Sequence, residues 1–185
     1  MSSPKQNAAD IAEKVIAVHK IWQGRIFGVE LLEVSLPDGS SAQREIVRHR
    51  GGVGVVAQDE QGRICLVRQW RVAFEKETLE IPAGKLEQGE DPEAAARREL
   101  FEETGLVAHR CAHLVDLAGS PGFTNELTRL YVVHDLEYAS PHPDEGEFVE
   151  CEWFGVQELV EMVLAGEIYD SKTVAAILAV HAHIV

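Results

Sequence analysis

Residues 84–106 read GKLEQGEDPEAAARRELFEETGL, the stretch of the chain with the clearest local signals. Asp91 is a good N-cap residue, Pro92 suits the first helical position, and Gly105 suits the position just past a helix. Alanine, the best helix former, fills three consecutive positions between them. The stretch therefore predicts a helix over 92–104, entered from a loop that contains glycine.

The charges on this predicted helix oppose its stability. Glu99, Glu102 and Glu103 stand at i, i+3 and i+4, so three carboxylates share one face. Like charges at this spacing destabilise a helix by roughly 0.2–0.5 kcal/mol per pair, and acids in the last turn oppose the helix dipole. Arg97 and Arg98 can offset part of this cost. The face is either a solvated acidic surface or a site for Mg²⁺ or Mn²⁺, which prefer oxygen ligands.

Segments with strand patterns lie on both sides of this helix. Val15–Leu36 alternates apolar and polar residues, which predicts strands. A turn follows over 37–40 and the alternation resumes over 44–50, which predicts a hairpin. Further strands are expected over 52–57, 64–67, 79–82, 107–117, 127–136 and 148–154, and helices over 156–165 and 171–183. This order of elements predicts an α/β or α+β sandwich with a mixed sheet.

Composition and charge disfavour several classes of function. The 185 residues include 17 Lys and Arg against 31 Asp and Glu, a net charge of −14. Binding to a nucleic acid backbone or an anionic membrane is therefore unfavourable. No apolar run reaches the roughly 20 residues of a membrane helix, and the first residues lack a secretion signal. Three widely spaced cysteines indicate neither a disulfide framework nor a zinc site. We expect a cytoplasmic protein without nucleic-acid or membrane partners.

The same stretch matches the Nudix motif, G-x5-E-x7-R-E-U-x-E-E-x-G-U, in which U is apolar. Every fixed position is filled, in the order Gly84, Glu90, Arg98, Glu99, Leu100, Glu102, Glu103, Gly105 and Leu106. The chain therefore resembles the Nudix hydrolases. The resemblance implies an α/β/α sandwich with a mixed sheet and an N-terminal extension of antiparallel strands. It also implies hydrolysis of a nucleoside diphosphate linked to another group.

A second resemblance narrows the branch of the family. Pro121 lies 16 positions after Gly105, within GSPGFTNE, and VRQWR over 67–71 and DEGEFVE over 144–150 accompany it. These segments are similar to the ADP-ribose pyrophosphatases. The resemblance implies Mg²⁺-dependent cleavage of ADP-ribose to AMP and ribose 5-phosphate, with Mn²⁺ able to substitute. Hydrolysis of another nucleotide sugar, such as ADP-glucose or GDP-mannose, and nucleotide sensing without turnover remain as alternatives.

The resemblance assigns the metal site to the helix and the loop before it. Glu99 and Glu103 are expected to bind the metal directly, together with the carbonyl oxygen of Ala83. Glu102 is expected either to bind the metal as well or to contact the residues that bind it. Glu102 and Glu103 both belong to the expected catalytic residues.

An acidic pair later in the chain completes the expected catalytic set. Glu145 and Glu147 are two positions apart, so both point to one side of an extended backbone. The resemblance implies that this loop supplies the general base and a further metal ligand. We expect Glu145 to be the base and Glu147 the ligand; the reverse assignment and a merely solvated acidic loop both remain open. Glu90 and Arg98 are expected to pair with each other or with the helix acids.

The resemblance also points to residues that bind the substrate. Arg71 matches a position that contacts the phosphates or the terminal ribose, work that suits a guanidinium fork. Arg44 stands where relatives often stack the base on an aromatic ring, and Phe27 serves either as a platform across a dimer or as packing. The six expected substrate residues are Phe27, Arg44, Glu45, Arg71, Lys85 and Ser120.

The chain is expected to consist of three parts. Residues 1–14 form a flexible start, 15–50 a strand region that dimerises, and 51–185 the Nudix hydrolase domain. The expected homodimer follows from the resemblance, because the N-terminal strands of similar enzymes exchange between subunits. Its expected small-molecule partner is a nucleoside diphosphate sugar. Glu80 lies at an alternating strand position, and a structural role fits it as well as a functional one.

Overall fold

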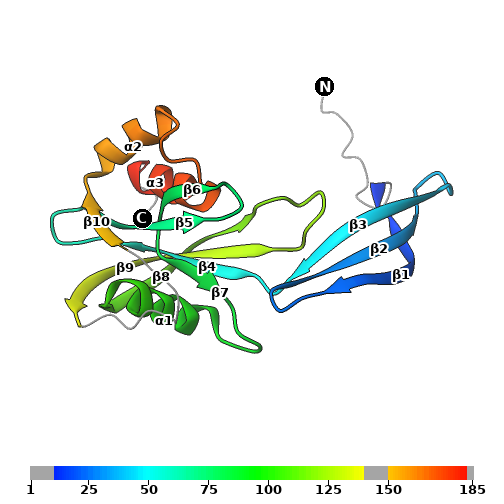
Figure 1. Ribbon diagram of the computed structural model, residues 1–185, viewed down its shortest axis with the longest axis horizontal. Coiled ribbons are helices and arrows are strands. Elements are labelled where there is room, and N and C mark those ends of the chain that lie inside the picture. Colours follow the sequence, from blue (N-terminus) through cyan, green and yellow to red (C-terminus); the bar gives the residue numbers. More distant parts are fainter. Residues whose placement is uncertain (1–10, 140–149, 183–185) are drawn as a thin grey trace, which may run out of the picture. The chain divides into compact units, whose positions relative to one another are not determined.

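The computed structural model describes residues 11–139 and 150–182, and the chain divides into two units (Figure 1). The first unit contains the described residues up to His49 together with Ser120–Glu126. The second unit contains Arg50–Gly119 and the described residues from Leu127 onward. The predicted helix of the motif belongs to the second unit.

The first unit is an antiparallel sheet in the strand order β1-β2-β3. Its strands are β1 (Lys14–Gln23), β2 (Phe27–Ser35) and β3 (Ser41–His49). The alternating stretch over 15–36 is thus two strands, because a turn in which the Gly24 amide donates to the Phe27 carbonyl (3.0 Å) reverses the chain. The predicted turn over 37–40 is confirmed, and Gly39 takes the left-handed φ of 85° that the turn requires.

A segment distant in the sequence completes the first unit. The Val47 amide donates to the Phe123 carbonyl at 2.7 Å. The Asn125 side chain accepts from the His49 amide at 2.9 Å and donates to the His49 carbonyl at 3.2 Å. Residues 120–126 therefore pack with the N-terminal strands, although the sequence assigns them to the expected hydrolase domain.

The second unit contains two sheets. A four-stranded sheet has the order β7-β4-β9-β8, with β4 and β9 parallel and the other pairs antiparallel, and a three-stranded antiparallel sheet has the order β10-β5-β6. The strands are β4 (Gly52–Ala57), β5 (Ile64–Arg71), β6 (Lys76–Glu80), β7 (Ala83–Lys85), β8 (Leu106–Ala118), β9 (Leu127–Tyr138) and β10 (Glu150–Phe154). Of the strand predicted over 79–82, only Leu79 and Glu80 lie in a strand, as the end of β6. Ile81 and Pro82, the latter without an amide donor, connect β6 to β7.

Helices cover the sheets of this unit on two sides, as Figure 1 shows for α1 (Pro92–Thr104) against α2 (Val156–Leu164) and α3 (Ser171–His181). Two separate clusters of buried apolar side chains match these sides, one with residues of α1 and the other with residues of α2 and α3. The predicted α/β/α sandwich with a mixed sheet is confirmed. Within the described residues, no helix is long and apolar enough to span a membrane.

The sequence of β4, GVGVVA, is continuously apolar because the strand is buried on both faces. Val53 and Val55 belong to the cluster under α1, and Val56 belongs to the cluster under α2 and α3. Because helices cover both faces, neither face needs polar residues. A Cβ on Gly54 would lie 2.9 Å from side-chain carbons of Ile81 and Leu130, so the central strand leaves no room there.

Helix α1 begins and ends where the sequence predicts. The Asp91 side chain accepts a hydrogen bond from the Ala94 amide at 3.0 Å, which caps the first turn. Gly105 adopts φ 72°, and its amide donates to the Phe101 carbonyl at 2.8 Å. Leu100 is fully buried on one side of the helix. The helix is thereby fixed along its length, and its acidic residues are held in defined positions.

Candidate active site

Two acidic residues of α1 lie against strand β7. The Glu103 residue is only 8% exposed, and its Oε2 accepts a hydrogen bond from the Ala83 amide at 3.0 Å. A Cβ built on Gly84 would lie 1.9 Å from Cδ of Glu99, so the Glu99 carboxylate fills the space over that glycine. Only glycine permits this approach. The fold therefore brings Ala83, Glu99 and Glu103, the three expected ligands within the described residues, to one place.

Arg98 gathers the neighbouring carboxylates. Its Nε and Nη2 donate to the two Glu90 oxygens at 2.9 and 3.0 Å, and its Nη1 donates to Glu99 and Glu102, each at 2.8 Å. Hydrogen bonds from Arg98 lower the pKa of Glu90, and hydrogen bonds to Glu90 followed by the charge of Glu99 raise the pKa of Arg98. The predicted supporting pair of Glu90 and Arg98 is confirmed. These ion pairs offset the repulsion along the acidic face of α1.

The donors gathered here suit a hard divalent cation. Carboxylate oxygens of Glu99 and Glu103 and the nearby Ala83 carbonyl are the oxygen ligands that Mg²⁺ and Mn²⁺ prefer. In the described part of the chain, no group of three or more His, Cys, Asp or Glu side chains is placed to hold a metal ion. The expected site adds the Ala83 carbonyl to two carboxylates. The expected base and ligand of the later loop, Glu145 and Glu147, lie outside the described residues.

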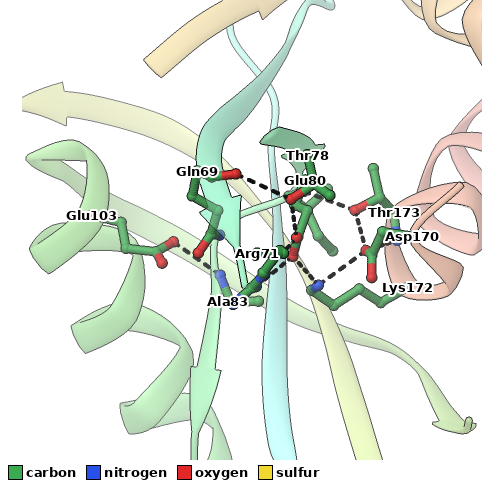
Figure 2. A network of polar contacts seen from close by, with 10 residues as sticks. Gln69, Arg71, Thr78, Glu80, Ala83, Glu103, Asp170, Lys172 and Thr173 are labelled. Carbon is green, nitrogen blue, oxygen red and sulfur yellow. Dashed lines mark hydrogen bonds and ion pairs between the residues drawn. The ribbon is translucent and has the colours of Figure 1, made fainter. Parts of the chain in front are cut away.

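Arg71, an expected substrate residue, belongs to a network on the β5–β6 pair (Figure 2). Its Nε and Nη2 donate to the two oxygens of Glu80, both at 2.7 Å. Glu80 is 2% exposed, and it also accepts from Thr78 Oγ1 at 2.6 Å and from Lys172 Nζ. Glu80 is therefore part of a buried network of ion pairs and hydrogen bonds, and it holds Arg71 in one orientation.

A comparison with family models identifies the fold and the motif. The model of the NUDIX domain matches residues 48–176. The chain belongs to the NUDIX family. The match spans most of the chain and includes the whole of α1 and β7, so the carboxylates described above are those of the NUDIX motif.

Relatives agree with this assignment over nearly the full length. The chain is 42% identical to the methanol dehydrogenase activator of Bacillus methanolicus, over 89% of this chain and 90% of the relative. It is 39% identical to the ADP-ribose pyrophosphatase of Bacillus subtilis, over 90% and 91%. A crystal structure of an ADP compounds hydrolase superposes with a TM-score of 0.81 at 22% identity, covering 93% of this chain and 94% of that one, which shows the shared fold.

The remaining expected substrate residues of this NUDIX protein divide between the two units. Lys85 is exposed on β7, beside Gly84. In the first unit, Arg44 pairs with Glu13 at 2.6 Å, and Glu45 is exposed on β3. The rings of Phe27 and Trp22 lie 5.2 Å apart between centroids, with their planes tilted by 53°. Ser120 also lies in the first unit, where its carbonyl accepts from the amides of residues 123 and 124, both at 3.1 Å.

Two residues beside this NUDIX site were missed by sequence reasoning. Lys172 comes far later in the chain than its partner Glu80, and no spacing rule connects them. Gln69 lies two positions before Arg71, so alternation places both on one face of β5. Its Nε2 is the buried side-chain polar atom that lacks a hydrogen-bond partner among the described residues. The two-residue period from Arg71 is the signal that could have pointed to Gln69.

The buried carboxylate of Glu80 has a strongly altered proton affinity. Burial by itself raises the pKa of Glu80, but hydrogen bonds from Arg71 and the charge of Lys172 outweigh burial and lower it to about 2. The ordinary value is 4.5, so the folded state favours the ionised form. Stability from this group is fully present above the ordinary pKa, and it is lost as the pH falls through the folded pKa.

We expect the free energy of unfolding to fall by about 3 kcal/mol between pH 4.5 and 2 because of Glu80 alone. Glu80→Gln, which cannot ionise, should lack this component. Urea titrations followed by tryptophan fluorescence at several pH values measure it. Glu152→Gln is the matched control, because Glu152 forms an exposed ion pair at 2.8 Å with Arg68 of β5, the strand that also carries Arg71. Parallel acid profiles for wild type and Glu80→Gln would contradict the expectation.

Proposed function

We propose that the protein is a cytoplasmic Mg²⁺-dependent hydrolase that cleaves ADP-ribose to AMP and ribose 5-phosphate. The observation that carries the proposal is the approach of Glu99 and Glu103 to the Ala83–Gly84 backbone within a complete NUDIX motif. The relative at 39% identity that is named an ADP-ribose pyrophosphatase supports the choice of substrate.

The charge of the substrate explains why this site needs cations. A diphosphate carries about two negative charges, and the protein has a net charge of −14. When bound, Mg²⁺ supplies local positive charge that polarises the phosphoryl oxygen and activates water. Glu99 and Glu103 would hold the ion with the Ala83 carbonyl, and Arg98 would keep Glu102 beside them. Glu145 would take the proton from the attacking water and Glu147 would add a ligand, or the reverse.

Two residues of β5 supply hydrogen-bond donors suited to the phosphates. Arg71 uses two N–H groups on Glu80, which leaves three of the five donors of a guanidinium for other acceptors. Gln69 presents on the same face a buried amide nitrogen that lacks a partner within the described chain. A phosphate oxygen would satisfy these donors, and burial makes an unsatisfied one unfavourable by about 1–3 kcal/mol.

The first unit supports a homodimer. On β1, the apolar side chains of Val15, Ile16, Val18, Ile21 and Trp22 are each more than half exposed. Exposed apolar surface of this kind is typical of protein interfaces. A second copy of the chain would cover it and would bring Phe27, Arg44, Glu45 and Ser120 into the complete substrate site. A monomer in light scattering would refute this part of the proposal.

A panel of nucleotide sugars tests the proposed reaction. With Mg²⁺ present, we expect kcat/KM for ADP-ribose to exceed that for ADP-glucose and GDP-mannose by about tenfold or more. Phosphate release from the products after phosphatase treatment measures the rates. A preference of more than about tenfold for GDP-mannose would replace ADP-ribose as the substrate. The absence of turnover with both Mg²⁺ and Mn²⁺ would favour a nucleotide sensor.

A further inference from the structure

The network around Glu80 joins three elements, β5, β6 and α3, of which α3 lies far outside the NUDIX motif (Figure 2). We propose that Lys172 and Glu80 are positioning residues, which hold the Arg71 guanidinium where it meets a phosphate of the substrate. The proposal rests on the proposed hydrolysis of a nucleotide sugar. It assigns to α3 a role in binding in addition to its role in the core.

The first step of the argument concerns Arg71, whose side chain is 41% exposed. A long side chain at such a position is normally mobile, and ordering it costs conformational entropy. Here two parallel hydrogen bonds of 2.7 Å to one carboxylate fix the plane of the guanidinium. Hydrogen bonds to Glu80 raise the pKa of Arg71, and the charge of Glu103 contributes in the same direction. Arg71 is therefore oriented and charged.

The second step concerns the support of Glu80 itself. Its side chain is 3% exposed, and a buried carboxylate is stable only when charges and hydrogen bonds compensate it. Arg71 and Thr78 donate to Oε1, and Arg71 and Lys172 donate to Oε2, so both oxygens are held from two directions. Lys172, 15% exposed, also lies 3.0 Å from Asp170. Removing Lys172 would leave Glu80 with one cation and free it to move together with Arg71.

The third step concerns the start of α3. Asp170 caps this helix by accepting hydrogen bonds from the amide (3.0 Å) and the hydroxyl (2.6 Å) of Thr173. The same hydroxyl oxygen accepts from the amide of Ile81 at 2.9 Å. Ile81 lies between Glu80 and Ala83, so the first turn of α3 fixes the chain that leads to the expected metal ligand. Both Arg71 and β7 thus depend on one helix end.

A double-mutant cycle tests the coupling. Lys172→Met should lower kcat/KM for ADP-ribose by about tenfold, mainly through KM, and Arg71→Ala by about a hundredfold. If Lys172 acts through Arg71, the double variant should be within about twofold of Arg71→Ala. Lys172→Arg, which keeps the charge, should restore most of the loss. Multiplicative effects of the two substitutions would overturn the proposal. Glu152→Gln, which breaks the Arg68 pair on the same strand, is the matched control.

A measurement without substrate separates this proposal from the proposed function. In ¹⁵N NMR spectra, the Arg71 Nε–H of the wild type should be ordered, and in Lys172→Met it should become mobile. If the wild type hydrolyses no nucleotide sugar, the proposed function fails, and this measurement still decides the positioning role. An unchanged Arg71 signal in folded Lys172→Met would overturn it. Lys172→Gln, a milder change, serves if circular dichroism shows that Lys172→Met is unfolded.

Discussion

Glu103→Gln should lower kcat for ADP-ribose by about a thousandfold or more and leave the fold intact. Glutamine removes the negative charge that an expected metal ligand supplies. It keeps an oxygen that can accept the hydrogen bond from the Ala83 amide, now 3.0 Å from Glu103 Oε2. The substitution separates the expected binding of an ion from the hydrogen bond to β7, because only ion binding needs the charge.

Steady-state kinetics and Mn²⁺ titration by calorimetry measure the effect of Glu103→Gln. We expect Mn²⁺ affinity to fall together with kcat, and thermal unfolding to change little. Glu93→Gln is the matched control on α1, because Glu93 lies in the first turn and pairs with Arg97 at 2.9 Å. It should retain wild-type turnover. A Glu103→Gln enzyme within about tenfold of the wild type would remove Glu103 from the expected ligand set.

Gly84→Ala should lower kcat/KM by about a hundredfold, since displacing a reacting group by about 1 Å has effects of this size. The new methyl group would lie 1.9 Å from Cδ of Glu99, far closer than two non-bonded carbon atoms can approach. Either the Glu99 carboxylate moves away from β7 or the backbone of β7 shifts. Both changes increase the separation of Glu99 from Ala83, the expected backbone ligand of the same ion.

Mn²⁺ affinity and kinetics of Gly84→Ala, compared with those of Gly155→Ala, check this expectation. Gly155 precedes α2, and a Cβ there would meet no atom within 4 Å. Its alanine variant should therefore keep wild-type kinetics, whatever its small effect on helix α2. Wild-type activity in Gly84→Ala would show that the position of Glu99 over Gly84 is irrelevant to turnover.

Local signals in the sequence were sufficient for α1 and its acidic face. Asp91 and Gly105 mark the helix ends because their hydrogen bonds form within a few residues of the chain. The approach of Glu99 and Glu103 to β7 also follows from a motif that is contiguous in the sequence. The strand expected over 52–57 is also confirmed, and its continuous apolar sequence matches its burial on both faces.

Contacts between distant segments could not be predicted in this way. Residues 120–126 pack with the N-terminal strands through hydrogen bonds to Val47 and His49, and nothing in either segment specifies the other. Lys172 and Glu80 are 92 positions apart, so only the tertiary fold brings them together. The break of the alternating stretch at Gly24 is a different case. A single glycine does not distinguish a turn from a bulge within one strand.

Arg98 gives this helix a countercharge of its own. By donating to Glu90, Glu99 and Glu102 at once, it balances the acidic face with a group that belongs to the polypeptide. Many metal-binding domains acquire their native state only when the ion arrives, because their ligands repel one another without it. Here Arg98 balances part of that repulsion, so we expect the fold of α1 to depend less on a bound ion than in such domains.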